Sequence, residues 1–302
     1  MEAKILITGA TGNVGSQVAK QLCERGVLPV AVVHSAGKAA AVKAHCAEVR
    51  VADFRDERQV ASLFEGIDKV FLVTPVTPDQ LEIGDRLIAA ADAAGVDHVV
   101  KLSIIGAEYE PGILLGRWHR HMEKMIERSS MRWTFLRPNG YMQNYIAAWG
   151  ATIGTEGKIY LPVGDGAMSC IDARDVAAAG VEALLGDGHA GQAYTLTGEV
   201  AHTNSEIAKL FTHVLEKAVG YVDVSEAAAR SSLEGASVPE PLVTGILELW
   251  ALQKGGGTAS VTTTYRELTG RSPRSFAQFI RDHASAWGAQ EDMQLGKAGM
   301  DG

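Results

Sequence analysis

The strongest constraint on the fold is a glycine-rich turn that separates a short apolar run from a helical pattern, within residues 3–26. The run at 5–7 is closed by Thr8 and is short enough for a strand that is buried on both faces. Glycines follow at positions 9, 12 and 15. Apolar residues then recur at helical spacing as far as Leu22, and Gly26 stands where the C-terminus of a helix prefers glycine. The stretch therefore predicts a buried strand, a tight turn and a helix that begins in the turn.

A turn of this kind predicts a site for the pyrophosphate of a dinucleotide. Glycines let the backbone approach the phosphates, and the helix N-terminus offers unpaired N–H groups with a partial positive charge. The spacing is G-x-x-G-x-x-G rather than G-x-G-x-x-G, and a glycine-rich turn without a ligand is the alternative. The residues of the turn that we expect to bind the cofactor are Gly9, Thr11, Gly12, Asn13, Val14 and Gly15.

Strand and helix patterns alternate through the first half of the chain. Apolar runs predict further strands, and amphipathic or alanine-rich segments between them predict helices. The expected strands are 28–33, 48–51, 69–73, 98–102 and 133–136, and the expected helices include 38–45, 59–64, 81–94 and 118–129. Such alternation is typical of an α/β fold, here a Rossmann doubly wound parallel sheet with right-handed crossovers.

The pattern changes after Tyr141. The segments expected beyond it are an extended piece at 157–163, a helix at 173–185, a strand at 192–196 and mostly helix from 203 to 287. We therefore expect a dinucleotide-binding domain at 1–150, completed by parts of 168–200, and a smaller, mostly helical, substrate-binding subdomain at 151–288. Residues 289–302 are polar with several glycines and are expected to form a flexible tail.

Composition and charge argue against several classes of protein. The 302 residues carry a formal net charge of −8 without a compensating stretch of Lys and Arg, so nucleic acid is a poor partner. No apolar run has the length of a membrane helix and no signal peptide is expected before the first strand, so we expect a cytoplasmic protein without a membrane partner. The three cysteines are scattered, which suggests neither a disulfide framework nor a metal site.

The residues after the second expected strand indicate which dinucleotide the site prefers. A carboxylate there would hydrogen-bond the ribose 2′-hydroxyl and repel a 2′-phosphate. The chain has His34 and, a little further on, Lys38 instead. NADP(H) is therefore the preferred cofactor and NAD(H) the alternative, unless both residues are simply solvated in a loop.

Candidate residues also follow the third, fourth and fifth expected strands, at the edge where parallel sheets bind ligands. Asp53 is placed to meet the adenine amino group and Phe54 to flank the ring, whereas a turn-forming or helix-capping Asp53 is the alternative. Thr74 and Pro75 are expected on the nicotinamide-ribose side, because proline ends the strand ladder there. Ser103 is placed to touch nicotinamide or substrate, or else to cap a helix.

An ordered series of motifs resembles the NmrA-like branch of the atypical short-chain dehydrogenase/reductases. The motifs are ILITGATGNVG (5–15), VTP (73–75), VKLS (100–103), WHRHME (118–123), LRPNGYMQN (136–144), GKIYLPVGDG (157–166), SCIDARDVA (169–177) and ELTGRSPRSFAQFIRDHA (267–284). The resemblance implies a Rossmann domain with a smaller C-terminal substrate domain and NADP(H) bound at the first turn. This branch includes quinone reductases, dye reductases, isoflavone-type reductases, aromatic polyketide tailoring enzymes and catalytically silent redox sensors. Many members carry Arg at the position of His34.

The helix expected after the fifth strand lacks the Tyr-x-x-x-Lys pair of ordinary short-chain dehydrogenases. In those enzymes the Tyr gives a proton to the alkoxide formed by hydride attack, and the Lys lowers its pKa. The helix here reads GRWHRHMEKMIER (116–128). Hydride addition to a quinone gives a phenolate-like oxyanion that needs no strong general acid, so positioning of the ring can supply most of the rate. A conjugated acceptor is therefore favoured over a simple ketone.

His119 and Glu123 are four residues apart and share one helix face. We expect His119 to donate a proton or hydrogen bond to the substrate oxygen and Glu123 to orient it, with His121 as the next candidate. A solvated face of paired charges is the alternative, and no metal site is expected.

The loop after the sixth strand is expected to line the substrate pocket, as the resemblance suggests. It carries Asn139, Tyr141 and Asn144, and the tyrosine offers an aromatic face for a flat ring and a hydroxyl for its oxygen. The catalytic candidates are thus His119, Tyr141 and Ser103. Residues that could shape an apolar pocket, or equally pack in a core, are Trp149, Leu249 and Trp250.

These observations favour an NAD(P)H-dependent reductase or redox tailoring enzyme that acts on a flat aromatic, quinone-like molecule without the usual Tyr-Lys dyad. One alternative is a non-catalytic NAD(P) redox-sensing regulatory protein, and another is an aromatic polyketide tailoring enzyme with a different net reaction. The intact loop at 136–144 and His119 favour catalysis. The expected partner is a small aromatic substrate, and a homodimer is considered.

Overall fold

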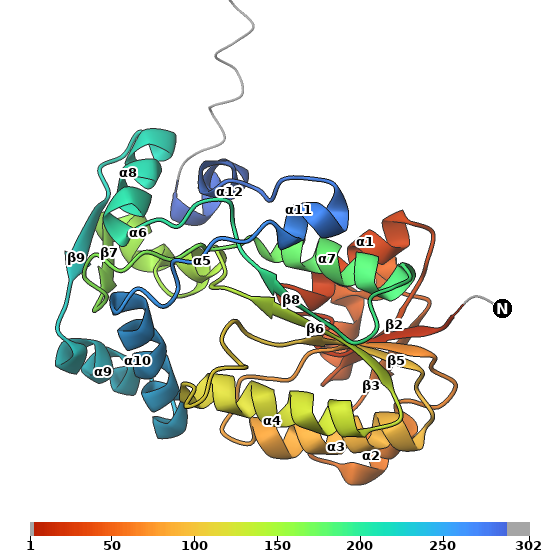
Figure 1. Ribbon diagram of the computed structural model, residues 1–302. Coiled ribbons are helices and arrows are strands. Elements are labelled where there is room, and N and C mark those ends of the chain that lie inside the picture. The colour runs from red at the N-terminus through yellow and green to blue at the C-terminus, as the bar shows by residue number, and fades with distance from the viewer. Residues whose placement is uncertain (1–2, 289–302) are drawn as a thin grey trace, which may run out of the picture.

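A seven-stranded sheet forms the centre of the protein in the computed structural model, which describes residues 3–288 (Figure 1). The strands are β1 (Ile5–Ile7), β2 (Val30–Val33), β3 (Glu48–Val51), β4 (Lys69–Leu72), β5 (His98–Leu102), β6 (Arg132–Pro138) and β8 (Gln192–Leu196). Their order is β3-β2-β1-β4-β5-β6-β8, and every neighbouring pair is parallel. The strand order reverses beside β1, which is the switch point where doubly wound sheets bind ligands. The expected Rossmann doubly wound fold is confirmed.

Helices cover both faces of this sheet (Figure 1). One face carries α1 (Gly15–Glu24), α7 (Ala173–Leu185) and α11 (Thr264–Thr269), and the other carries α2 (Glu57–Ser62), α3 (Gln80–Ala93) and α4 (Leu114–Arg128). The helix expected at 38–45 is wrong, because the chain forms two 3-10 segments there, Ala36–Ala41 and Lys43–His45. Neither segment buries a residue, and a short helix without an apolar face packed on a core gains little from its hydrogen bonds.

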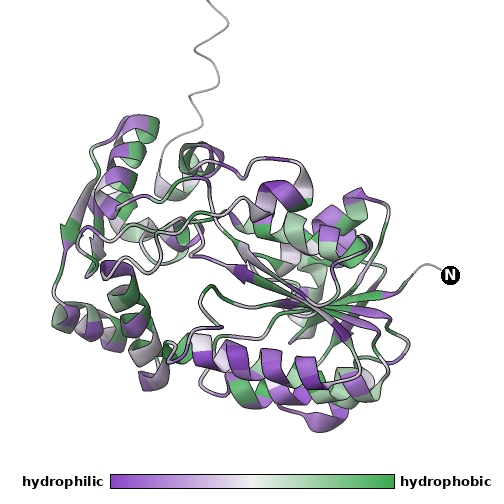
Figure 2. Ribbon diagram, in the orientation of Figure 1, coloured by the Kyte–Doolittle hydropathy of each residue, from purple (hydrophilic) through white to green (hydrophobic). Residues whose placement is uncertain are grey.

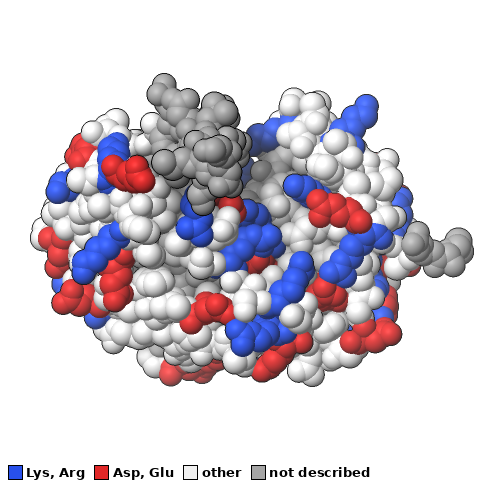
Figure 3. All heavy atoms as spheres, turned by 90° about the horizontal axis from the view of Figure 1, so that it is seen from above, with Lys and Arg blue, Asp and Glu red and all other residues white. Residues whose placement is uncertain are grey.

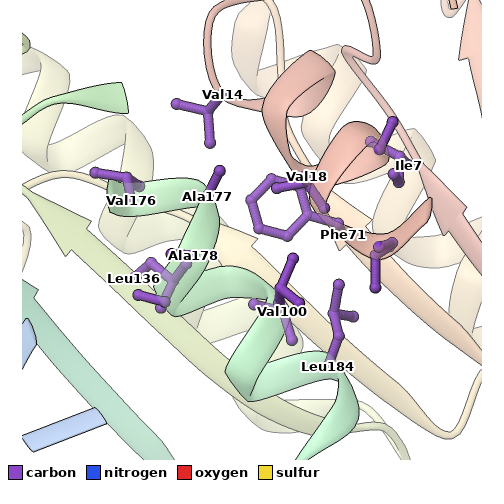
Figure 4. Packing of buried hydrophobic residues seen from close by; sticks show 14 of the residues in the cluster. Ile7, Val14, Val18, Phe71, Val100, Leu136, Val176, Ala177, Ala178 and Leu184 are labelled. Carbon is purple, nitrogen blue, oxygen red and sulfur yellow. The ribbon is translucent and has the colours of Figure 1, made fainter. Parts of the chain in front are cut away.

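The core between the sheet and α1 and α7 is closely packed. Figure 4 shows Phe71 and Val100 of the sheet beside Val18 of α1 and Ala177 of α7. Small residues on α7 permit this approach, since a Cβ on Gly180 would lie 2.7 Å from Cε2 of Phe71. Burial of one such aromatic or branched side chain contributes about 1.5–3 kcal/mol. The strand interiors are accordingly hydrophobic and the outer helix faces polar (Figure 2).

A smaller unit lies beyond the carboxyl ends of the sheet strands (Figure 1). Its two parallel strands are β7 (Lys158–Leu161) and β9 (Gly220–Asp223). Its helices are α5 (Asn144–Ala147), α6 (Gly150–Glu156), α8 (Asn204–Leu215), α9 (Glu226–Gly235), α10 (Glu240–Lys254), α12 (Phe276–Asp282) and the 3-10 segment Ala284–Trp287. The C-terminal region is thus mostly helical, as expected. The flexible tail expected at 289–302 lies outside the described residues.

Aromatic rings build the core of the smaller unit. Phe211 meets Trp287 edge to face with ring centroids 4.8 Å apart, and Tyr145 meets Phe276 in the same way at 5.1 Å. Such pairs stabilise by about 0.5–1.5 kcal/mol beyond the area they bury. The smaller unit therefore has a hydrophobic core of its own.

Surface charges on the protein are mixed in sign. Over the face drawn in Figure 3, basic side chains lie near acidic ones. Ion pairs of the protein include Arg174–Asp282 and Arg266–Glu199. Within residues 3–288, no helix is long and apolar enough to span a membrane. The same residues contain no cluster of His, Cys, Asp and Glu that could hold a metal ion.

Candidate active site

The glycine turn between β1 and α1 forms a cradle for phosphate. Gly9 has a φ of +62°, which side chains other than glycine rarely adopt. A Cβ on Gly15 would collide with the carbonyl oxygen of Gly9, so the helix can start this close to the strand only with glycine there. No side chain caps the N-terminus of α1, and its first turn holds no acidic residue. Its N–H groups and partial positive charge therefore face the turn, which suits a pyrophosphate.

A cleft of about 480 Å³ runs from this turn to the ends of β2 and β3. Eight of the residues expected to bind the cofactor line it, namely Gly9, Thr11, Gly12, His34, Asp53, Phe54, Thr74 and Pro75. Lys38 does not line the cleft but is exposed on the 3-10 segment Ala36–Ala41. Lys38 therefore does not line the cleft, whereas His34 does.

Arg55 is a lining residue of this cleft that the sequence analysis missed. Its Nε donates to Oδ2 of Asp79 at 2.6 Å, and its side chain is largely exposed. The backbone N–H of Arg55 donates to Oδ1 of Asp53 at 2.9 Å, so Asp53 forms a turn as well as lining the cleft. The helix cap is supplied by Asp56 instead. The signal that could have pointed to Arg55 is its place next to Phe54, directly after a strand.

The cleft fits NADP(H). Its phosphate end is the glycine turn with the uncapped N-terminus of α1. Its adenosine end is lined by the basic residues His34 and Arg55, and no carboxylate stands directly after β2. A cation near the ribose attracts a 2′-phosphate, whereas a carboxylate after β2 would repel it. The residues that would hold the cofactor are thus those of the turn, the ends of β2 and β3, and Thr74.

A second cavity, of about 300 Å³, adjoins the cleft and shares Gly9, Gly12, Val73 and Thr74 with it. We call it the chamber. Its wall is mostly apolar and includes Val76, Ile104, Ile105, Leu115, Met168 and Leu249. Leu249 thus lines the chamber, whereas Trp149 and Trp250 pack against the cores of the smaller unit. A planar ligand in such a space would lose its water on both faces.

The smaller unit also contacts α4, the helix that lines one side of the chamber. The backbone N–H of Leu114, at the start of α4, donates to Oε2 of Glu248 on α10. No side chain at the N-cap position caps α4, so this carboxylate from α10 serves that purpose. The contact places Leu249 of α10 and Leu115 of α4 on the same chamber.

The chamber gathers the polar residues expected at the substrate, which are Ser103, His119, Asn139, Tyr141 and Asn144. Besides Gly9, Gly12, Thr74 and Ser103, three further members of the expected cofactor set line it, namely Asn13, Val14 and Gly15. The hydroxyl of Tyr141 makes no hydrogen bond within residues 3–288, and burial raises the pKa of Tyr141. A tyrosine in this state stays protonated and offers its proton to a ligand oxygen.

Two of these polar residues have donors that the protein already uses. The amide nitrogen of Asn139 donates to Oγ of Ser169 and to the carbonyl oxygen of Thr258, each at 2.8 Å. The hydroxyl of Ser103 donates to Oε1 of Glu123 at 2.6 Å. Asn139 thereby links the loop after β6 to Ser169 and Thr258. The catalytic role of Ser103 stays a prediction, in which its hydroxyl oxygen can only accept a hydrogen bond from a ligand.

Glu123 does not orient His119, and this part of the prediction is wrong. Its carboxylate is fully buried and accepts from Nε of Arg137 at 3.0 Å and from Nη2 at 2.8 Å, besides Ser103. Burial alone would raise the pKa of Glu123, but the hydrogen bonds from Arg137 and Ser103 outweigh it and hold that pKa below its ordinary value. The helical spacing correctly predicted that His119 and Glu123 share one face of α4. The guanidinium of Arg137 on β6 is nevertheless the stronger partner of the Glu123 carboxylate.

Lys101 takes the place that was expected for Glu123. Its Nζ lies 2.8 Å from Nδ1 of His119, and in its ammonium form it can only donate to that nitrogen. With Nδ1 as the acceptor, the ring proton stands on the other nitrogen, Nε2. Nε2 is 3.4 Å from the amide nitrogen of Gln80, the long limit for a hydrogen bond, and both residues line the chamber.

The imidazole of His119 is neutral at neutral pH, because burial and the neighbouring Lys101 hold the pKa of His119 well below its ordinary value. Gln80 was not expected in the site, although it lines the chamber and donates to Oγ1 of Thr74 at 3.1 Å. The other candidate, His121, points away from the chamber and pairs with Asp85 at 2.9 Å. His119 is therefore the histidine of the site.

Comparison with known proteins identifies the family. The model of the NmrA-like family matches residues 1–268. An NAD(P)H azoreductase of Xenophilus azovorans is 38% identical over 285 residues, covering 94% of this chain and 99% of that protein. A (4-alkanoyl-5-oxo-2,5-dihydrofuran-3-yl)methyl phosphate reductase of Streptomyces griseus is 37% identical, with 94% and 99% covered. The crystal structure of an NADPH-dependent quinone oxidoreductase of Escherichia coli with NADPH superposes with a TM-score of 0.82 at 30% identity, over 92% and 99% of the chains. The chain belongs to the NmrA-like family.

Proposed function

We propose that this protein transfers hydride from NADPH to a flat, conjugated acceptor of the quinone or azo type, while His119 and Tyr141 donate to the acceptor. The observation that carries the proposal is the chamber. It shares Gly9 and Thr74 with the dinucleotide cleft, it is walled by apolar side chains, and it holds two neutral donors. A planar acceptor bound there would lie against the end of the cofactor.

The names of the relatives indicate the general activity of the chain. The chain is an NAD(P)H-dependent oxidoreductase, since the relatives that it matches over nearly their whole length carry that activity in their names. Those names include an azoreductase and a quinone oxidoreductase, and both acceptor classes are planar and conjugated. They support an acceptor of the same kind here.

The bound nicotinamide supplies a hydride. The residues of this chain bind and orient the acceptor, exclude water with the apolar wall, and place Nε2–H of His119 and the hydroxyl of Tyr141 toward the oxygen or nitrogen that becomes negative. Delocalisation stabilises that negative charge, so neutral donors suffice and the absent Tyr-Lys dyad is no obstacle. Positioning then accounts for most of the rate.

The proposal is tested by mixing the purified protein with NADPH and a panel of quinones, azo dyes and simple ketones. We expect the nicotinamide absorbance to fall faster than without protein for the conjugated acceptors and not for the ketones. For a quinone, the hydroquinone formed should equal the NADPH consumed. If NADPH binds but no acceptor is reduced, the redox-sensing alternative replaces this proposal, and if the product is coupled rather than reduced, the tailoring alternative does.

A further inference from the structure

A lysine is buried directly behind the imidazole of the site. Lys101 lies on β5 with no exposed surface, and its Nζ donates to the carbonyl oxygen of Leu102 at 3.1 Å besides meeting Nδ1 of His119. It does not line the chamber, so any effect on a ligand passes through His119. Burying an amine without a carboxylate partner is costly, and no carboxylate of the described residues forms an ion pair with it.

The surroundings make this amine ready to release its proton. The charged groups that face it are Glu123 of α4 and Arg137 of β6, with His119 as the third titratable neighbour. Burial is the main cause that lowers the pKa of Lys101 to about 7, while Glu123 raises it and Arg137 lowers it. Because Glu123 is itself bound by Arg137, its attraction for the ammonium is largely offset.

We propose that Lys101 is a positioning residue that fixes the Nε2–H form of His119 and passes a proton to Nδ1 as Nε2 releases one to the substrate. The contact that carries this is the 2.8 Å separation between Nζ and Nδ1 of His119, a residue that lines the chamber. The inference rests on the proposed function, since it assumes an acceptor that becomes negative in the chamber.

The step balances in protons and electrons. The two electrons arrive with the hydride that the proposed function takes from NADPH, and they leave the acceptor with a negative oxygen or nitrogen. The N–H bond at Nε2 of His119 breaks as that atom takes the proton, and a new N–H bond forms at Nδ1 with a proton from Nζ of Lys101. The result is a neutral amine, a neutral imidazole in its other tautomer and a neutral product, and one proton from solvent then restores the pair. A buried ammonium and a buried anion thus neutralise each other.

The first test measures the tautomer and the titration of His119 by NMR, without any ligand. The protein is labelled with ¹⁵N at its nine histidines, and the signal of His119 is assigned by its loss in His119→Gln. Two-bond ¹H–¹⁵N spectra then report the tautomer and the titration of this ring. In the wild type we expect the Nε2–H form at neutral pH. In Lys101→Met we expect a mixture of tautomers and a higher titration midpoint, because a neighbouring cation and donor are gone.

Kinetics supply the second readout. The wild-type kcat should fall as pH rises through about 7, since the relay needs the protonated amine. In Lys101→Met this decline should disappear and kcat should be about tenfold to a hundredfold lower, with the NADPH dissociation constant unchanged. Lys124→Met is the matched control, because Lys124 lies on the same helix as His119 but is exposed and pairs with Glu110.

Each result bears on the inference. An Nδ1–H form of His119 in the wild type would overturn it before any variant is made, and so would identical tautomers and titrations in wild type and Lys101→Met. Lys101→Gln is the second variant if Lys101→Met does not fold. Failure of the proposed function looks different, since the wild type would then reduce no acceptor while the histidine spectra still showed the pair.

Discussion

Replacing Tyr141 by Phe separates a ligand contact from a structural one. The Tyr141 hydroxyl lines the chamber and has no hydrogen-bond partner in the described part of the chain. Deleting it removes one oxygen and leaves no protein group unpaired. We therefore expect Tyr141→Phe to change the free energy of unfolding by no more than about 0.5 kcal/mol.

The effect on catalysis should be much larger. A hydrogen bond to a charged group is worth about 1.5–3 kcal/mol, and the acceptor becomes negative only as the hydride arrives. Each 1.36 kcal/mol is about a factor of ten in rate, so kcat should fall by about tenfold to a hundredfold in Tyr141→Phe. The assay is the steady-state rate of NADPH oxidation with saturating quinone. Calorimetry should show the same NADPH affinity as the wild type, because Tyr141 does not line the dinucleotide cleft.

Tyr145 provides a matched control four residues further on. Its hydroxyl is buried and donates to Oδ1 of Asn204 at 2.7 Å, away from the chamber. Tyr145→Phe leaves that oxygen unpaired, so we expect a loss of about 1–3 kcal/mol in the free energy of unfolding, with kcat unchanged. The reasoning is refuted if Tyr141→Phe keeps the wild-type kcat, or if it destabilises the protein as much as Tyr145→Phe does.

Three further substitutions test the cradle, the buried carboxylate and the cofactor preference. Gly15→Ala should abolish NADPH binding in calorimetry and lower stability by about 1–3 kcal/mol, because the new Cβ meets the Gly9 carbonyl; normal binding would contradict the cradle. Glu123→Ala removes the buried carboxylate partner of Arg137 but leaves it Glu108 at 3.2 Å, so it should cost about 1.5–3 kcal/mol in urea unfolding at neutral pH. Since the folded-state pKa of Glu123 is depressed, this stability is present above its ordinary value of 4.5 and is lost as pH falls through the folded-state pKa, so the two proteins should converge in acid. Arg55→Gln should weaken NADPH about tenfold and NADH little, and an equal loss for both would show that Arg55 does not meet the 2′-phosphate.

The strands of the sheet could be predicted because parallel strands are apolar on both faces. All four residues of β2, Val30–Val33, are buried, and such a run has few alternatives to a central strand. The segment at 38–45 has an equally suggestive alanine-rich sequence and nevertheless forms 3-10 turns. What differs is tertiary packing, since only Val42 of this segment is buried, and local sequence does not record it.

The residues of the site also differ in whether the sequence could place them. Residues at strand ends, such as Thr74 and Tyr141, could be placed because topology fixes where parallel strands end. Lys101 could not, since inside the run HVVKL it resembles an interior strand residue, and only the packing of α4 on β5 reveals its contact with His119. The partner of Glu123 was likewise missed, because Arg137 reaches it through the packing of α4 on β6.

The electrostatics of the chamber also restrict the acceptor. Its donors, His119 and Tyr141, are both neutral at neutral pH, and its wall is apolar, so an ion that entered would lose hydration, and a cation would gain no counter-charge in return. A neutral acceptor pays no such cost on entry. Once hydride has been added, the charge that develops is matched by the ammonium of Lys101 behind the imidazole. The arrangement would therefore stabilise the negative state of an acceptor more than the neutral one, which is the condition for catalysis, and it favours uncharged conjugated acceptors over cationic ones of the same shape.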